Sequence, residues 1–304
     1  MKDLIAAFGM SKQNFYQRLD KLGHRSAEEE QLLNMVQKVR KNHPRMSARA
    51  MYKMILPQTI GRDRFERLCL ENGYRVKKER NYRVTTNSNG VVRFPNLIQN
   101  IEVTAVNQVF VSDITYYEMN GRFYYLTFIM DLYNREIVGS SVSDNLRTEQ
   151  TTIPALWQLI KTRGEQNLEG AIFHSDGGGQ YYSKEFKSIT EALKMHNSMT
   201  CEGVFENAHA ERLNGIIKND YLYPYHPNDW KALKKDLKKA IWMYNNEKPH
   251  SSLKGLSPVR YRSGNAVDNE NIYSRYFPLP TAHHHHQINN NFKGKEMSNK
   301  VNLI

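Results

Sequence analysis

The sequence of 304 residues predicts an α/β fold, in which helices flank a mixed five-stranded sheet and an all-α region precedes it. Two observations predict the sheet. Apolar segments at residues 109–116, 122–130 and 136–142 are separated by short turns, and later apolar segments alternate with helical ones. The third observation is that apolar residues recur at helical spacing throughout residues 1–74. Small helical units therefore precede one larger core.

The first unit is expected at residues 1–24, as two short helices around a break at Gly9. Ser11 is a suitable N-cap for the second helix, whose apolar face includes Leu19 and Leu22. Helix, glycine-containing turn and helix form the outline of a helix-turn-helix, in which Lys12 could face DNA. An ordinary helical hairpin fits this outline at least as well.

A second helical unit is expected at residues 25–80 and a linker at residues 81–99. The unit's first helix should end near Pro44, and Ser47 should cap the next. A third helix carries Phe65, Leu68 and Leu70 before the stop signal at residues 72–73. This arrangement is another candidate helix-turn-helix. The linker is rich in Asn, Ser and Thr and has little apolar periodicity.

Positive charge is concentrated in this second unit. Residues 38–83 contain fourteen Lys or Arg and four acids, which gives this segment a net charge of +10. The formal net charge of the whole chain is +12. Such a block is typical of a protein that binds a polyanion, although a solvated basic surface is the alternative. The candidate DNA-binding residues in this region are Arg45, Arg49, Arg62, Arg64, Lys77 and Lys78.

The larger core is expected at residues 100–264, followed by a flexible polar tail at residues 265–304. After the three antiparallel strands we expect a helix at 148–162, a strand at 171–175, a helix at 185–196, a strand at 199–201, and helices at 207–221 and 229–246. This order describes a sheet of the ribonuclease-H-like kind.

Composition excludes several classes of protein. Cys69 and Cys201 are too far apart in sequence to suggest a zinc site or a disulfide. The longest apolar-rich run, residues 124–130, is far too short to span a bilayer. We therefore expect a cytoplasmic protein that has no membrane partner.

Three acids stand where acids are unusual. Asp113 interrupts an apolar strand, and Asp176 directly follows another strand and precedes three glycines. Glu211 lies on the helix at 207–221, with 34 residues between it and Asp176. Asn207, Asn214 and Lys218 lie at helical spacing from Glu211 and share its face. Each acid alone could cap a turn or be solvated, but together they suggest a metal site.

Oxygen ligands with no His or Cys cluster suit magnesium, with manganese as a substitute. A pair of such ions can activate an attacking oxygen and stabilise a leaving one during phosphodiester cleavage. No Ser or Tyr stands out as a covalent nucleophile. The predicted chemistry is therefore metal-dependent phosphoryl transfer, with Asp113, Asp176 and Glu211 as ligands.

Five segments resemble bacterial insertion-sequence transposases with a retroviral-integrase-like (DDE) core, and among them the second-frame catalytic protein of the third family. The segments are NQVFVSDITY (107–116), DLYNREIVG (131–139), HSDGGGQY (174–181), NAHAERL (207–213) and YNNEKPHSSL (244–253). Three positions depart from the family's usual residues: Phe110 replaces Trp, Glu206 replaces Asp and Arg212 replaces Ser. None of these is one of the three acids.

The resemblance implies a transposase that binds element ends, cleaves phosphodiester bonds and joins 3′-hydroxyl ends to target DNA. It implies that Asp113, Asp176 and Glu211 are catalytic metal ligands and that Lys218 contacts a DNA phosphate, with Asn207 and Asn214 beside it. It further implies double-stranded DNA and further copies of the chain as partners, in association with the bacterial nucleoid. Two rivals are a catalytically silent DNA-binding regulator and a nuclease that cuts without joining.

Overall fold

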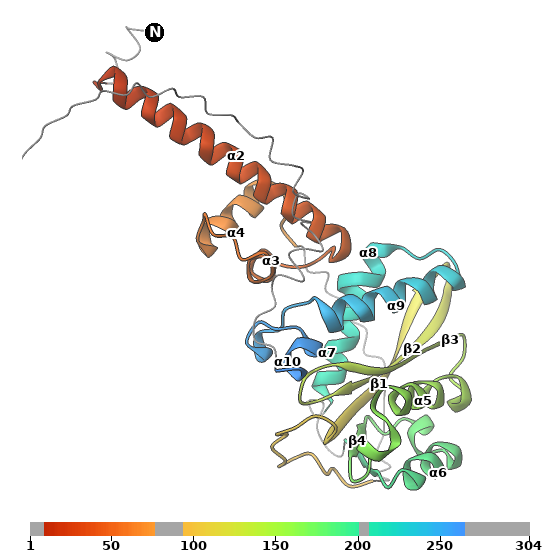
Figure 1. Ribbon diagram of the computed structural model, residues 1–304. Helices are drawn as coiled ribbons and strands as arrows, with labels where there is room; N and C mark the ends of the chain where they lie inside the picture. Colours follow the sequence, from red (N-terminus) through yellow and green to blue (C-terminus); the bar gives the residue numbers. More distant parts are fainter. Residues whose placement is uncertain (1–8, 77–93, 201–206, 265–304) are drawn as a thin grey trace, which may run out of the picture.

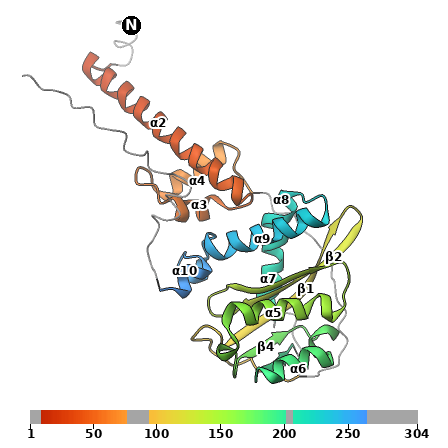
Figure 2. The same ribbon diagram turned by 45° about the vertical axis from the view of Figure 1, so that its right-hand side comes forward.

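The computed structural model describes residues 9–76, 94–200 and 207–264 (Figure 1). A helical unit at residues 12–76 stands beside a core at residues 94–264. The long first helix of this unit projects away from the core (Figures 1 and 2). The expected tail and most of the expected linker lie outside the described residues.

Three helices form the amino-terminal unit: α2 (Lys12–Asn42), α3 (Ala48–Ile55) and α4 (Arg62–Glu71). The Ser11 hydroxyl accepts a hydrogen bond from the Asn14 amide, and the Ser47 hydroxyl accepts one from the Ala50 amide. Each serine thereby satisfies one of the free amides of a first helical turn. Both serine caps predicted from sequence are therefore present.

The expected break between two helical units at residue 24 is absent, because α2 continues through it to Asn42. Gly23 costs a helix only about 1 kcal/mol relative to alanine, which is too little to end it. Arg25 and Glu29, one turn apart, form an ion pair along the same stretch. The sequence also predicted Leu70 among the apolar residues that α4 buries. In the structure Leu70 is exposed, and Cys69 is buried instead.

The core contains five strands in the order β3-β2-β1-β4-β5, which confirms the predicted mixed sheet. The strands are β1 (Val109–Met119), β2 (Arg122–Asp131), β3 (Ile137–Ser143), β4 (Ile172–Ser175) and β5 (His196–Met199). The first three are antiparallel neighbours, whereas β4 is parallel to both β1 and β5. Residues 94–97, expected in the linker, contact β5, since the Leu97 amide donates to Ser198 Oγ.

Helices cover both faces of the sheet (Figure 2). They are α5 (Thr152–Arg163), α6 (Lys184–Ala192), α7 (Ala208–Ile216), α8 (Tyr223–Tyr225), α9 (Trp230–Asn246) and α10 (Pro258–Arg262). Phe110 packs with α5 and α6, whereas Val109 and Val111 pack with α7 and α9. This alternation follows from the period of two along a strand.

Two helix predictions needed correction. The helix expected at 185–196 ends at Ala192, because Lys194 turns with a φ of 55° and His196 begins β5. The helix expected at 148–162 begins only at Thr152, and Pro154 lies in its first turn, where a missing amide removes no helical hydrogen bond.

A π-helical segment, η4 (Ile217–Leu222), continues α7 toward the amino-terminal unit. There the His43 ring is hydrogen-bonded to the Tyr221 hydroxyl and to the Glu247 carboxylate, each at 3.0 Å. The Tyr225 hydroxyl donates to the carbonyl of Asn42 at 2.7 Å. The helix that carries Glu211 is therefore connected directly to the end of α2.

Candidate active site

Asp113 and Asp176 occupy matching positions on two neighbouring strands. Ser112 of β1 pairs with Ser175 of β4, and each aspartate is the next residue of its chain. Adjacent strands lie about 5 Å apart, so the parallel register places the two acids side by side. Asp113 was predicted as an acid within a strand and Asp176 as an acid at a strand's carboxyl end, and both positions are observed.

The polar face of α7 and η4, which helical spacing predicted from Asn207, Asn214 and Lys218, lies against β1. Asn214 Nδ2 donates to Asp113 Oδ2 at 2.7 Å, and Asn207 Nδ2 donates to the carbonyl of Ser112 at 3.1 Å. Lys218 Nζ donates to Thr115 Oγ1 at 2.7 Å. These three contacts fix the helix across the strand that carries Asp113.

Glu211 is on this same face, between Asn207 and Asn214, but its side chain is exposed to solvent. Its negative charge still acts on Asp113. Within the described parts of the chain, no three Asp, Glu, His or Cys side chains are close enough together to hold a metal ion. The three acids thus share an electrostatic environment but not a common coordination position.

Negative charge at this site is poorly compensated. Burial, together with the nearby carboxylates of Asp176 and Glu211, raises the pKa of Asp113 to about 7, although the charge of Lys218 acts in the opposite direction. Burial also raises the pKa of Asp176, although the Gly178 amide donates to its Oδ1 at 3.1 Å. Burial lowers the pKa of the Lys218 ammonium. A bound cation would relieve the mutual repulsion of these acids.

Tyr181 supports the two strands from beneath the acids and was not singled out in the sequence. Its hydroxyl lies 2.9 Å from Ser112 Oγ, and Ser112 Oγ also donates to the carbonyl of Phe128. The buried ring packs against Phe173 and Phe186. The signal available in sequence was its position five residues after Asp176, within a glycine-rich turn.

The predicted DNA-binding residues of the amino-terminal unit are dispersed. Lys12 is exposed at the start of α2, and Arg45 is half-buried beyond its end. The remaining described arginines form ion pairs within the unit: Arg49 with Glu66, Arg62 with Asp63 and Arg64 with Glu29. Lys77 and Lys78 lie outside the described residues.

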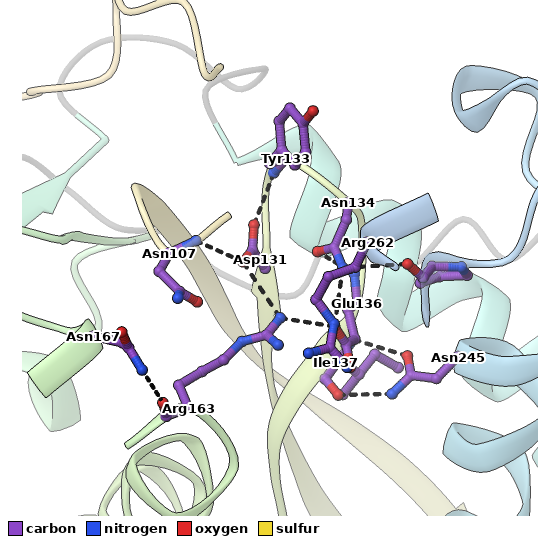
Figure 3. Close-up of polar contacts among 11 residues, drawn as sticks. Asn107, Asp131, Tyr133, Asn134, Glu136, Ile137, Arg163, Asn167, Asn245 and Arg262 are labelled. Atoms are coloured by element: carbon purple, nitrogen blue, oxygen red, sulfur yellow. Dashed lines mark hydrogen bonds and ion pairs between the residues drawn. The ribbon is translucent and has the colours of Figure 1, made fainter. Parts of the chain in front are cut away.

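A second group of acids lies at the end of β2 and is neutralised by arginines (Figure 3). Arg163 of α5 contacts Glu136 at 2.7 Å and Asp131 at 3.4 Å, and all three side chains are buried. Arg262 of α10 contacts Glu136 at 3.1 Å. The segment 131–139 therefore forms a buried ion network that holds α5 and α10 to the sheet.

The last long helix is fixed by one asparagine. Asn245 Oδ1 accepts from the Ile137 amide at 2.9 Å, and Asn245 Nδ2 donates to the Ile137 carbonyl at 2.8 Å (Figure 3). Sequence analysis did not single out Asn245, whose neighbour Asn246 bonds only within α9, to Trp242. None of the helices in residues 9–76, 94–200 and 207–264 is long and apolar enough to cross a membrane.

Comparison with known proteins assigns most of this core to one domain family. Residues 103–204 and 204–258 match the integrase core domain. In solved structures, the catalytic core domain of HTLV-2 integrase in complex with magnesium is similar, with 24% identity, a TM-score of 0.42, and 52% of this chain and 97% of that chain covered.

Bacterial relatives extend the match. The chain is 35% identical to the uncharacterized 31 kDa protein of insertion element IS600 from Shigella sonnei, over 67% of this chain and 75% of that protein. It is 32% identical to a transposase-like protein of Haemophilus influenzae, over 55% and 77% respectively. It is 27% identical to the transposase InsF of IS3A from Escherichia coli, over 64% and 67%.

Enzymes with the integrase core depend on divalent metal ions, in keeping with the acids described above, whose negative charges lie close together. The order of elements, the paired aspartates and the bacterial relatives lead to one assignment. This chain belongs to the IS3-like insertion-sequence transposases, which are DDE-type polynucleotidyl transferases with an integrase catalytic core.

Proposed function

We propose that this transposase binds the ends of its element, cleaves there, and joins the resulting 3′-hydroxyl ends to target DNA, with Asp113, Asp176 and Glu211 as its catalytic residues. One observation carries the proposal: Asp113 and Asp176 follow paired residues of two parallel strands, and the charge of Asp176 raises the cost of ionising Asp113, which the charge of Lys218 offsets only in part. Such partly compensated acids are typical of sites that perform chemistry.

The donor set fits magnesium, with manganese as a substitute. Carboxylate oxygens are the ligands that these hard cations prefer. The amide oxygens of Asn207 and Asn214 are also buried at this site with no hydrogen-bond partner, which leaves further oxygen atoms for a cation or its water. When bound, a pair of such ions supplies charge stabilisation to the attacking and leaving oxygens of a phosphodiester.

The chain's own residues orient the ligands. Asn214 holds one oxygen of Asp113, which leaves the other oxygen to turn toward Asp176. The Lys218 ammonium donates a hydrogen bond to Thr115, so we propose that Lys218 positions the helix that carries Glu211. To contact a DNA phosphate, Lys218 would have to break this hydrogen bond. Glu211, exposed on α7, must rotate toward the aspartates to complete the ligand set.

Recognition of DNA is proposed for the amino-terminal unit. Its formal charge and three-helix arrangement support an electrostatic interface, to which Lys12, Arg45, Arg49, Arg62 and Arg64, with Lys77 and Lys78, would contribute. Two element ends must be joined to one target, so two active sites are needed at one place. We therefore propose that more than one copy of the chain acts on the DNA.

The test is an assay of purified protein with labelled duplexes taken from the flanks of its gene, in the presence of magnesium. Wild-type protein should yield joined products, and Asp176→Asn should yield none while it binds the duplex equally well. Asp144→Asn, an exposed acid after β3, is the matched control and should join normally. Binding without scission by wild-type protein would contradict the proposal, and scission without joining would indicate a nuclease.

A further inference from the structure

A second charged group lies beside the α7 helix, and its sign is opposite to that of the acids. Arg135 belongs to the turn between β2 and β3, and Arg212 follows Glu211 directly on α7. His250 lies beyond α9, and its ring packs edge-on against Tyr244, with 4.7 Å between centroids. These residues come from three separate segments, so the fold and not the local sequence gathers them.

Electrostatic effects show that the group is compact. Burial, together with the positive charges of Lys248, Arg212 and Arg135, lowers the pKa of His250 to about 3. Arg135 and Arg212 also act on each other and on Tyr244. Both guanidinium groups therefore lie close to the Tyr244 and His250 rings.

Two polar nitrogen atoms of this group have no hydrogen-bond partner among the described residues. Arg135 Nη1 and His250 Nε2 are buried, and neither makes a hydrogen bond within the described residues. A buried donor without an acceptor costs about 1–3 kcal/mol, and more when it is charged. Arg135 also has a φ of 62°, which is uncommon for a residue other than glycine. The fold thus accepts strain to place this guanidinium where no described residue satisfies its Nη1.

The nearest acids are already engaged. Asp131 accepts hydrogen bonds from the amides of Asn107 and Tyr133 and contacts Arg163. Glu136 contacts Arg163 and Arg262. The charge of Asp131 still acts on Arg135, but both carboxylates are engaged by Arg163, so the positive group can attract an external anion.

From this geometry we infer that Arg135, Arg212 and His250 form a phosphate-binding site beside the catalytic acids. Guanidinium groups match the oxygens of a phosphate in charge and in fork geometry, and a buried imidazole adds one more donor. Arg212 is adjacent to Glu211, so a DNA strand that crosses the acids would bring a backbone phosphate within reach. The inference rests on the proposed function for the source of that phosphate.

The test measures affinity of the full chain for a short labelled duplex by fluorescence anisotropy, in EDTA and over a range of salt concentrations. Each phosphate contact contributes about 0.9 to the slope of log affinity against log salt. Arg135→Gln and Arg212→Gln should each reduce the slope by about that amount and weaken binding by about tenfold. Arg135→Lys should keep most of the slope, because it keeps the charge.

The matched control is Arg122→Gln, an exposed arginine at the opposite end of β2 from the turn of Arg135. It should leave the slope unchanged. An equal reduction in Arg122→Gln would show a general loss of positive charge and would overturn the inference. Should Arg135→Gln fail to fold, Arg212→Gln still decides, because Arg212 is exposed on α7.

A second arm distinguishes a DNA phosphate from free phosphate. If inorganic phosphate raises the melting temperature of wild-type protein but not of Arg212→Gln, while the DNA slope is unchanged, the site binds a free anion. Unchanged slope and unchanged phosphate response in both variants would overturn the inference. Because EDTA prevents cleavage, Asp176→Asn should retain the wild-type slope, so failure of this site and failure of the proposed catalysis give different results.

Discussion

Two groups of acids on one sheet differ in how their charge is balanced. At the end of β2, Asp131 and Glu136 are buried, and Arg163 and Arg262 provide their positive charge. Across β1 and β4, Asp113 accepts hydrogen bonds from the Asn214 side chain and from a backbone amide, Asp176 accepts one from the Gly178 amide, and the charge of Lys218 acts on Asp113. The comparison teaches that buried acids with arginine partners hold the fold, whereas acids that repel one another mark the site of chemistry.

The largest expected effect is on activity. Asp113→Asn keeps the shape of the side chain but removes the charge that would hold a divalent cation. Joining of labelled element ends should fall by about a thousandfold or more. The melting temperature should not fall, because the substitution also removes repulsion with Asp176 and Glu211. Retained activity, or a large loss of stability, would place Asp113 with the structural acids.

Arg163→Met tests the other side of the comparison. It leaves the buried carboxylates of Asp131 and Glu136 without their shared cation, which should cost about 3–5 kcal/mol of unfolding free energy. Denaturant unfolding at neutral pH measures this cost. Adding Glu136→Gln to the Arg163→Met variant should restore part of the lost unfolding free energy. A loss below about 1 kcal/mol would mean that Arg163 does not stabilise the fold.

The pH dependence of stability should also report the charge of Asp113. The folded-state pKa of Asp113 is about 7, above its ordinary value of 3.8. Protonated Asp113 therefore favours the folded state below pH 4, and this contribution is lost as pH rises toward 7. Wild-type stability should fall by on the order of 3 kcal/mol relative to Asp113→Asn over that range. Parallel pH curves for the two proteins would show that the charge of Asp113 is compensated.

The smallest effect is expected at the positioning residue Asn214. Asn214→Ala removes the hydrogen bond to Asp113 Oδ2 and should reduce joining by about 10- to 100-fold, as is usual for partners of metal ligands. The apparent affinity for magnesium, taken from the metal dependence of the rate, should weaken with it. Asn246→Ala, whose amide bonds only within α9, is the control and should change neither quantity.

Much of the core could be predicted because its signals are local. Apolar alternation predicted β1, β2 and β3 to within a few residues, and the spacing from Asn207 to Lys218 predicted that these polar residues share one helix face. The position of Asp176 followed from the strand before it and the glycines after it. Each of these inferences needed only neighbours within a few positions.

The rest depended on contacts between distant segments. The partners of Arg163 are 27 and 32 residues away, and nothing in its helix identifies them. The continuity of α2 through Gly23 reflects a small energy difference that a glycine alone does not decide. The bond between His43 and Glu247 joins residues 204 positions apart, so docking of the helical unit on the core was not predictable.

The central claim is that Asp113, Asp176 and Glu211 together hold a divalent cation. Its most direct test is titration of the full chain with Mn²⁺, followed by electron paramagnetic resonance, with and without a DNA duplex. Wild-type protein should bind Mn²⁺, Asp113→Asn and Asp176→Asn should lose that binding, and Glu211→Gln should weaken it. Equal binding by wild type and by the variant that carries all three substitutions would contradict the claim.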